Sequence, residues 1–429
     1  MTSARRASLT RARRADPVRG RVLIIVQNLP VPFDRRVWLE CQALTEAGYE
    51  VHVVCPKAPG DPTHELVDGV MLHKYRPSPA GSGFVGYLVE YSHSFVMTAW
   101  LTSRAFRRKR FDVIQTCNPP DIFWALGLIF GSLTGSRFVY DQHDLCPELY
   151  ASRFADGSRL AARALRVLER LNYRTADHVI ATNNSYRNVA VSRGGKSSSE
   201  VTVVRTGPDA ERLHREAPDP LRKRGRRYLV AYLGVMGPQD GVDNVVRAAY
   251  EIVHRMGRED IGFTLVGSGD CFDDLVALRD ELGLEDFVEF TGRVPDDVVA
   301  RVLSTADLGL SPDPLNPLND VSTMNKTLEY MAFELPVVAY DLKETRVSAG
   351  PAAVYAEPNR VDSYAKAIVE LLDDEPRRRW MGSHGRQRIE QELGWTHQRG
   401  NYVAVYDGLL GQHRASEGTD TGTPDAAEG

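Results

Sequence analysis

The chain alternates short apolar runs with longer stretches in which apolar residues recur every three or four positions. The first two apolar runs are RVLIIV (21–26) and VHVVCP (51–56), and the stretch VWLECQALTEAGYE between them has helical periodicity. Further runs predict strands at 111–116, 137–142 and 177–182. Strands that alternate with helices indicate a parallel sheet covered by helices on both faces.

A second series of the same kind follows a charged, proline-bearing stretch that comes after VTVVRTGPD (201–209). Its predicted strands are YLVAYLG (228–234), GFTLVGSG (262–269), FVEFTG (287–292), ADLGLSP (306–312), PVVAYD (336–341) and AAVYAE (352–357). We therefore expect an α/β protein with two Rossmann-like, doubly wound halves and a central cleft between the carboxyl ends of their strands.

This pattern predicts the division of the chain. The expected parts are a disordered basic arm (1–19), an N-terminal Rossmann-like domain (20–210), a linker (211–227), a C-terminal Rossmann-like domain (228–395), a helix that crosses back to the first domain (396–415) and a disordered tail (416–429). The arm holds six arginines and no apolar core, so it does not resemble a secretory signal.

Composition narrows the choice of function. The chain has 429 residues, of which 42% are hydrophobic and 26% charged, and its formal net charge is -4, so no overall field attracts nucleic acid and we expect no nucleic-acid partner. The five cysteines form no C-x-x-C pair, which is typical of reduced residues in a cytosolic protein. The longest apolar stretches fall short of the roughly 20 residues that span a bilayer.

The segment NDVSTMNKTLEYMAFELPVVA (319–339) places Lys326 and Glu329 at the start of a predicted helix that follows a strand. The free N–H groups of a helix start attract anions, and Lys326 adds a positive charge there. Glu329, one turn further along, can accept two hydrogen bonds from a ribose diol. The segment therefore suits a nucleoside diphosphate, although a solvated helix edge is the alternative.

Three other stretches have weaker signals. GFTLVGSGD contains Gly267 and Gly269, but a G-x-G pair alone favours a tight turn over dinucleotide binding. YDQHDLCPE places His143 at the carboxyl end of a strand, where it is either structural or catalytic. In NLPVPFDRRVWLE, helix capping is a sufficient explanation for Asp34, and Arg35 and Arg36 are compatible with a solvated face.

Six stretches taken together resemble the retaining glycosyltransferases of family 4. These are GVMGPQDGVDNVVRAA (234–249), FTLVGSGD, VEFTGRVP (288–295), ADLGLSP, NKTLEYMAFELPVVA and VRTGPD, and the resemblance covers about residues 20–410. It implies the GT-B fold, with the donor sugar nucleotide on the C-terminal domain and the acceptor on the N-terminal domain. MGPQDG is similar to a loop of the WbuB-like and WcaI-like exopolysaccharide and O-antigen transferases.

Resemblance and placement together give a set of expected site residues. The catalytic residues are His143, Lys326 and Asp320, the donor-binding residues are Glu329, Gly237, Arg293, Asn325, Gly267 and Arg205, the acceptor-binding residues are Asp34 and Arg35, and no metal ligand is expected. The resemblance implies that Glu329 holds the ribose and that His143 lies over the donor sugar. Lys326 and Arg293 are expected to stabilise the leaving diphosphate.

Three positions depart from the family pattern. The first glutamate of the family's Glu-x7-Glu motif falls at Val321, so Asp320 is the nearest carboxylate. The arginine and lysine that the family places near the diphosphate fall at Val235 and Asp240. Two alternatives to a transferase therefore stay open: an inactive nucleotide-sugar-binding subunit and a GT-B epimerase of UDP-sugars.

The remaining expectations concern partners and location. The chain contains no D-x-D triplet, so we expect no cofactor and a metal-independent reaction with a UDP- or GDP-sugar as co-substrate. Residues 87–111 mix aromatic, apolar and basic residues, which is compatible with a helix that rests on a membrane or with a core helix that has a solvated basic end. We expect a saccharide or lipid-linked saccharide acceptor and a cytoplasmic protein, peripheral at the inner face of the plasma membrane.

Overall fold

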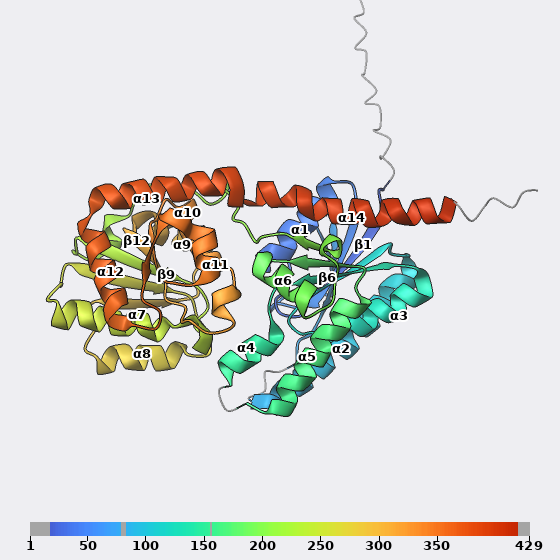
Figure 1. Ribbon diagram of the computed structural model, residues 1–429, viewed down its shortest axis with the longest axis horizontal. Helices are drawn as coiled ribbons and strands as arrows, with labels where there is room; N and C mark the ends of the chain where they lie inside the picture. Colours follow the sequence, from blue (N-terminus) through green and yellow to red (C-terminus); the bar gives the residue numbers. More distant parts are fainter. Residues whose placement is uncertain (1–17, 79–82, 155–156, 419–429) are drawn as a thin grey trace, which may run out of the picture.

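The structure is a computed structural model that describes residues 18–78, 83–154 and 157–418. The arm expected over 1–19 and the tail expected over 416–429 fall outside these ranges except for their inner ends. The chain forms two parallel-sheet halves (Figure 1). None of the described helices is both long and apolar enough to cross a bilayer.

The N-terminal half is built on an eight-stranded sheet in the order β3-β4-β2-β1-β5-β6-β7-β8. Its strands are β1 (Arg21–Ile25), β2 (Glu50–Pro56), β3 (His64–Val67), β4 (Val70–Tyr75), β5 (Val113–Cys117), β6 (Arg137–Gln142), β7 (His178–Ala181) and β8 (Val201–Val203). All neighbours pair in parallel except β3 and β4, which are antiparallel. The central strands β1 and β5 are buried apart from Arg21 at the start of β1, as their continuous apolar runs predict.

The hairpin of β3 and β4 was not predicted from the sequence. Asp68 and Gly69 form its turn with positive φ angles of 46° and 84°. An Asp-Gly pair between two strands is a strong signal for such a tight turn, so the sequence did contain the information. The hairpin adds an antiparallel edge to an otherwise parallel sheet.

Helices cover both faces of this sheet. They are α1 (Arg35–Glu46), α2 (Gly83–Arg108), α3 (Trp124–Thr134), α4 (Cys146–Arg153), α5 (Arg159–Thr175) and α6 (Asn184–Ser192). In Figure 1, α2, α3 and α5 gather on the side of the sheet away from α14 (Trp395–Gly418). The apolar side chains of α14 belong to the same core as those of α1, β1 and β2, so this helix completes the N-terminal half.

The C-terminal half has a six-stranded parallel sheet in the order β11-β10-β9-β12-β13-β14. Its strands are β9 (Tyr228–Leu233), β10 (Ile261–Val266), β11 (Val288–Gly292), β12 (Leu308–Ser311), β13 (Val337–Tyr340) and β14 (Ala353–Ala356). Its helices are α7 (Val242–Tyr250), α8 (Phe272–Glu281), α9 (Asp296–Thr305), α10 (Asn325–Ala332), α11 (Lys343–Ala349), α12 (Val361–Asp373) and α13 (Glu375–Arg388). All six strands lie close to the segments that the apolar runs predicted.

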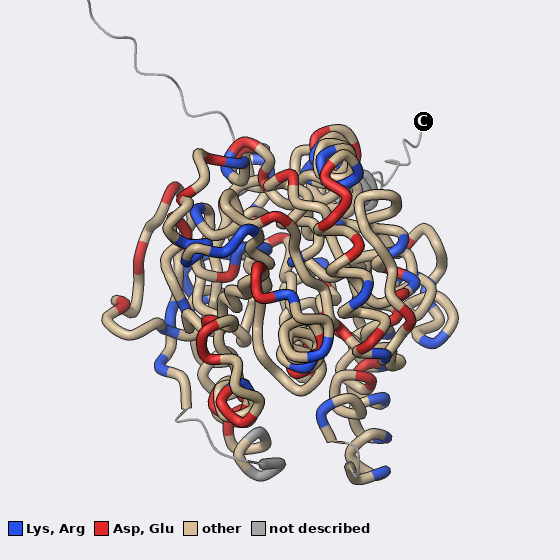
Figure 2. Tube along the Cα trace, turned by 90° about the vertical axis from the view of Figure 1, so that its left-hand side faces the viewer, with Lys and Arg blue, Asp and Glu red and all other residues tan. Residues whose placement is uncertain are grey.

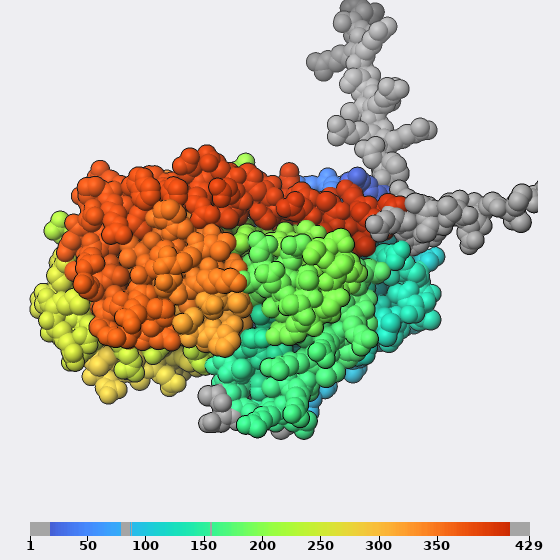
Figure 3. Space-filling model, in the orientation of Figure 1, coloured from blue at the N-terminus to red at the C-terminus, as the bar shows by residue number. Residues whose placement is uncertain are grey.

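The two halves lie in direct contact. On the face drawn in Figure 3, the orange surface of the C-terminal half adjoins the green surface of the N-terminal half, and α13 and α14 run over both. Side chains from the carboxyl ends of both sheets meet there. We call this contact region the junction.

Candidate active site

Helix α10 is held against its sheet by one aromatic ring. Gly309 in β12 has no side chain, and a Cβ atom there would lie 2.4 Å from the ring of Tyr330. The Tyr330 hydroxyl donates to the carbonyl of Leu310 at 3.0 Å and accepts from the N–H of Leu233 at 2.8 Å. This close packing fixes the start of α10 at the carboxyl ends of β9 and β12, and no side chain caps that start.

Lys326 lies in the first turn of α10 and is not a free cation. Its Nζ atom is 2.5 Å from Oδ1 of Asp313 and 3.8 Å from Oδ1 of Asp240, and its side chain is 9% exposed. Burial lowers the pKa of this amine, but the attraction of Asp313 and Asp240 outweighs burial and raises it. Lys326 is therefore charged and already paired with two carboxylates, neither of which was expected from the sequence.

Asp240 stands where the resemblance places a cation, and it closes its own loop. Its Oδ2 atom accepts from the N–H of Gly237 at 3.0 Å. Burial raises the pKa of Asp240 to about 6, although Lys326 opposes the shift. The loop between β9 and α7 thus contributes a carboxylate that becomes mostly ionised as the pH rises from about 6 to neutral.

Gly267 lies where the loop after β10 closely contacts the loop after β9. Its φ angle is +134°, and a Cβ atom would lie 1.8 Å from the carbonyl oxygen of Gly234. A larger residue would push the β10 loop away from the β9 loop. The turn interpretation accounts for Gly267, and it places this loop beside the one that carries Gly237 and Asp240.

Glu329 faces the N-terminal half. Its Oε1 atom accepts from Nη1 of Arg35 at 3.3 Å, and Nη2 of Arg35 donates to Oδ1 of Asp296 at 2.8 Å. Burial raises the pKa of Glu329 and Arg35 opposes that shift. Arg35, expected among the acceptor residues, therefore joins the two halves through two carboxylates.

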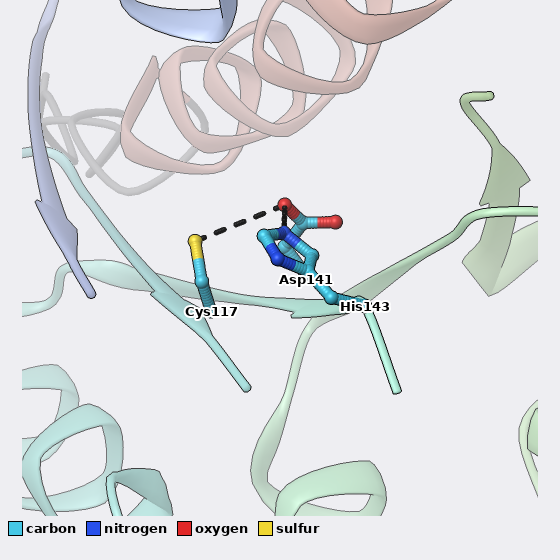
Figure 4. Close-up of side chains that lie close together, drawn as sticks. All are labelled: Cys117, Asp141 and His143. Atoms are coloured by element: carbon cyan, nitrogen blue, oxygen red, sulfur yellow. Dashed lines mark hydrogen bonds and ion pairs between the residues drawn. The ribbon is translucent and has the colours of Figure 1, made fainter. Parts of the chain in front are cut away.

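His143 belongs to a buried ionic group of the N-terminal half. Its Nε2 atom lies 2.6 Å from Oδ2 of Asp141, whose other oxygen accepts from Nη2 of Arg36 at 2.8 Å (Figure 4). Burial alone would raise the pKa of Asp141, but Arg36 and His143 outweigh burial and lower it. Asp141 and His143 are two residues apart at the end of β6, so their side chains share one side of the chain.

Cys117, Asp141 and His143 are close enough to resemble a metal site, but their chemistry does not fit one. Cys117 Sγ is 3.8 Å from Asp141 Oδ2. Burial raises the pKa of the Cys117 thiol well above its ordinary value, so this thiol is protonated in the metal-free protein. The Arg36 guanidinium already occupies the carboxylate, so a second cation would meet repulsion.

Asp320 and Val321 lie at the other end of the junction. Asp320 Oδ1 accepts from the N–H of Lys343 at 2.9 Å and so caps α11. Asn183, the N-cap residue of α6, donates from Nδ2 to the carbonyl of Val321 at 2.9 Å. The segment before α10 is thus held against the N-terminal half, and the Asp320 carboxylate is engaged with α11.

The remaining predicted residues have separate surroundings. Asp34 accepts from the N–H of Val37 at 3.1 Å and caps α1, as the capping explanation states. The guanidinium of Arg293 lies 5.5 Å from the ring centre of Phe33, across the junction. Arg205 is buried 3.8 Å from Glu344, and Asn325 is the exposed first residue of α10.

A hollow of about 540 Å³ opens away from these residues. It is lined by Ala210, Glu211, His214, Arg386, Glu390 and Thr396. None of the predicted site residues contributes to it. The site is therefore defined by side chains at the junction and not by this hollow.

Two sequence families match the chain and together cover most of it. Residues 34–207 match the family described as Glycosyl transferase 4-like domain, and residues 227–374 match Glycosyl transferases group 1. A 2-deoxystreptamine glucosyltransferase of Streptomyces kanamyceticus is 25% identical over 390 residues, which are 87% of this chain and 98% of that protein.

Solved structures share the fold. A sucrose-phosphate synthase from Thermosynechococcus elongatus superposes with a TM-score of 0.73 at 18% identity, over 92% of this chain and all of the other. Anabaena Alr3699/HepE in complex with UDP and glucose gives a TM-score of 0.68 at 16% identity, over 91% of this chain and all of the other. At these identities the likeness establishes the fold.

Proposed function

The chain belongs to the group 1 glycosyltransferases of family 4, and on that premise we propose that it moves a sugar from a nucleoside diphosphate sugar to an acceptor hydroxyl with retention of configuration. The observation that carries this proposal is that Lys326 and Glu329 both lie near the start of α10. Lys326 faces the loops that carry Asp240 and Asp313, and Glu329 faces the N-terminal half. A donor has to bind between these parts.

The donor has a defined place in this proposal. The ribose hydroxyls donate to the carboxylate of Glu329, and the diphosphate lies between the free N–H groups at the start of α10 and the loop that carries Gly237. Lys326 is held 2.5 Å from Asp313, so it is pre-positioned and does not lose side-chain freedom when the donor binds. Arg293, exposed beside Phe33, supplies a second cation from the junction.

The reaction breaks the bond between the anomeric carbon and the phosphate oxygen and forms one between that carbon and the acceptor oxygen. The acceptor proton passes to the leaving phosphate on the same face of the sugar. Negative charge grows on the leaving diphosphate, so the N–H groups of α10 and Lys326 stabilise the transition state. His143, fixed by Asp141, orients the sugar from the N-terminal half.

We propose a lipid-linked saccharide as acceptor and cell-surface polysaccharide synthesis at the inner face of the plasma membrane as the setting. Support comes from the mixed aromatic, apolar and basic character of α2. Because the chain is similar to a 2-deoxystreptamine glucosyltransferase, glucose is the donor sugar to test first. UDP is the carrier to test first, because the similar structure of Alr3699/HepE is a complex with UDP and glucose.

Transfer is tested with purified protein, UDP- and GDP-sugars, and both free and polyprenyl-linked saccharide acceptors. We expect an acceptor-linked sugar whose anomeric proton shows the configuration of the donor in its NMR spectrum. Lys326→Ala is expected to abolish this product while the protein stays folded. Neither transfer nor donor hydrolysis under any condition would indicate a binding subunit, and a free epimerised sugar nucleotide would indicate an epimerase.

A further inference from the structure

Exposed large apolar side chains concentrate on three helices of the N-terminal half. Each of these nine side chains is between 47% and 77% exposed. They are Leu88, Val89, Val96 and Trp100 on α2, Leu128, Ile129 and Leu133 on α3, and Leu160 and Val167 on α5. Exposed apolar groups that gather in this way mark an interaction site, whereas scattered ones do not.

Helix α2 has its apolar and polar residues reversed for a helix that faces water. Val96 and Trp100 point outward, whereas Thr98 and Thr102 are buried alongside Leu101. Among the residues that the structure describes, the buried Thr102 hydroxyl has no hydrogen-bond partner. A helix selected only for packing on its sheet would bury Val96 and Trp100. The apolar side chains on the outer side of α2 therefore suit contact with a partner that is less polar than water.

Arginines accompany these apolar residues. Eight exposed arginines lie on α2 and α5, and in the described part of the chain none of them pairs with a carboxylate. They are Arg104, Arg107 and Arg108 on α2, and Arg159, Arg163, Arg166, Arg170 and Arg174 on α5. The five on α5 are spaced by three or four residues, which places them on one side of the helix.

Carboxylates are turned away from this surface. The described residues of α2, α3 and α5 include two, Glu90 and Glu169. Glu90 accepts from Gln27 at 2.9 Å, and Glu169 is buried against Arg193 at 2.6 Å. In Figure 2 the lower turns of α5, at the lower right, show basic positions and no acidic ones. The local charge is therefore strongly positive, although the whole chain is negative.

The three helices form one continuous surface. The rings of Phe106 on α2 and Phe130 on α3 stack with centres 4.5 Å apart, and α3 packs against α5. All three lie on the side of the sheet away from α14 (Figure 1). We call the exposed residues of α2, α3 and α5 named above the basic-apolar face.

We propose that the basic-apolar face docks on an anionic lipid bilayer. The apolar side chains enter the boundary between headgroups and acyl chains, and the arginines bind lipid phosphates through paired N–H groups. The α2 helix was the candidate from the sequence, and the structure adds α3 and α5, which carry most of the arginines. This inference does not depend on the transfer reaction.

Other partners fit the surface less well. A second copy of the chain would place the same arginines against one another, because a twofold interface brings identical surfaces together. A nucleic acid would satisfy the arginines but leave nine exposed apolar side chains without a partner. A bilayer with anionic headgroups satisfies both kinds of side chain.

Vesicle flotation tests the proposal with the full-length protein. We expect binding to phosphatidylglycerol-containing vesicles, little binding to pure phosphatidylcholine vesicles, and loss of binding as salt increases. Arg163→Gln combined with Arg166→Gln is expected to weaken partitioning by about 30-fold, because each basic residue near an anionic surface contributes about a factor of five.

Matched variants separate this mechanism from general charge effects. Arg215→Gln combined with Arg377→Gln removes two exposed arginines elsewhere that pair with no carboxylate of the described residues, and it is expected to leave binding unchanged. Trp100→Ser is expected to weaken binding at constant charge. Equal loss in both double variants, equal binding to both vesicle types, or a dimer that the Arg163 and Arg166 changes dissociate would overturn the proposal.

Donor binding provides the second measurement. Titration with a sugar nucleotide in the absence of vesicles is expected to give the same Kd for the Arg163 and Arg166 variant and the unaltered protein. Failure of vesicle binding with intact donor binding overturns the docking alone. Failure of donor binding in the unaltered protein overturns the proposed function and leaves the docking result standing.

Discussion

Arg35 and Glu329, one from each half of the chain, are joined across the junction at 3.3 Å. The same Glu329 carboxylate is the proposed acceptor for the ribose hydroxyls of the donor. Arg35 and the ribose therefore compete for one group. Since Arg35 is 48% exposed, its ion pair contributes modestly, about 0.2–1 kcal/mol.

Arg35→Ala is expected to tighten donor binding by up to about fivefold, because it removes this competitor from Glu329. Calorimetric titration with a nucleoside diphosphate sugar measures the effect. Arg212→Ala is the matched control, since Arg212 contacts Asp296 and not Glu329. An unchanged or weaker Kd in Arg35→Ala would show that the two groups do not compete.

Donor binding is expected to weaken as pH rises through about 6. Asp240 has a pKa of about 6, and its ionised form repels the diphosphate beside Lys326. Asp240→Asn should flatten this part of the pH profile, and Asp240→Lys should strengthen binding by adding the missing cation. Asp270→Asn, at a mostly exposed carboxylate, is the control. A profile that Asp240→Asn does not alter would contradict this role.

The free energy of unfolding that Asp240 contributes also decreases as the pH rises, as the donor affinity does. Its folded pKa lies above the ordinary value of 3.8, so the folded state binds the extra proton. The stabilisation is complete below pH 3.8 and is lost as the pH rises through about 6. Asp240→Asn is therefore expected to stabilise the protein at neutral pH, which urea unfolding can measure.

Three histidines at the edge of the N-terminal sheet predict sensitivity to acid. His52 Nδ1 lies 3.0 Å from His73 Nε2, and His73 Nδ1 lies 3.2 Å from His64 Nδ1. Burial lowers the pKa of all three, that of His73 to about 4. Their neutral forms stabilise the fold above the ordinary value of 6.5, and this stability is lost as the pH falls toward about 4.

His73→Gln should reduce the loss of stability between pH 6.5 and about 4. The reason is that the variant has no imidazole to protonate between His52 and His64. Urea unfolding followed by circular dichroism at several pH values measures this change. His254→Gln is the control, because His254 is exposed and belongs to the C-terminal half, away from these three histidines. An identical pH dependence in both variants would contradict the prediction.

Asp141 is expected to position His143 and not to contact the sugar. Asp141→Asn keeps the shape but removes the charge beside His143 and Arg36, so kcat should fall by about 100-fold with little change in donor KM. Buried Arg36 loses one of its two carboxylate partners and keeps Glu40, so unfolding must be monitored in parallel. Asp307→Asn, at a partly buried carboxylate of the C-terminal half that pairs with Lys223, is the control. A proportional rise in KM with unchanged kcat would contradict a positioning role.

The sequence predicted most of the strands because each central strand is a short, fully buried apolar run. It did not predict β3 and β4, whose pairing depends on the turn at Asp68 and Gly69. The surroundings of Lys326 were also missed. Asp313 and Asp240 are 13 and 86 positions away along the chain, and only the meeting of two loops brings them to its ammonium group.

The ionic group around His143 has the same explanation. Asp141 stands two positions before His143 in the sequence, but its partner Arg36 comes from α1, 105 positions earlier. Arg36 was grouped with Arg35 as a solvated face, yet it is buried and Arg35 is exposed. Neighbours in a helix point to different sides, and the sequence alone does not tell which side meets the core.

The central claim is that the start of α10 binds a nucleoside diphosphate, with the ribose on Glu329. Calorimetric titration of the unaltered protein and of Glu329→Gln with a sugar nucleotide tests it most directly. We predict a Kd about 100-fold weaker in the variant, because hydrogen bonds to the charged carboxylate are lost, and a free energy of unfolding lowered by no more than the roughly 0.2–1 kcal/mol of the Arg35 ion pair. Equal affinity in the two proteins would contradict the account.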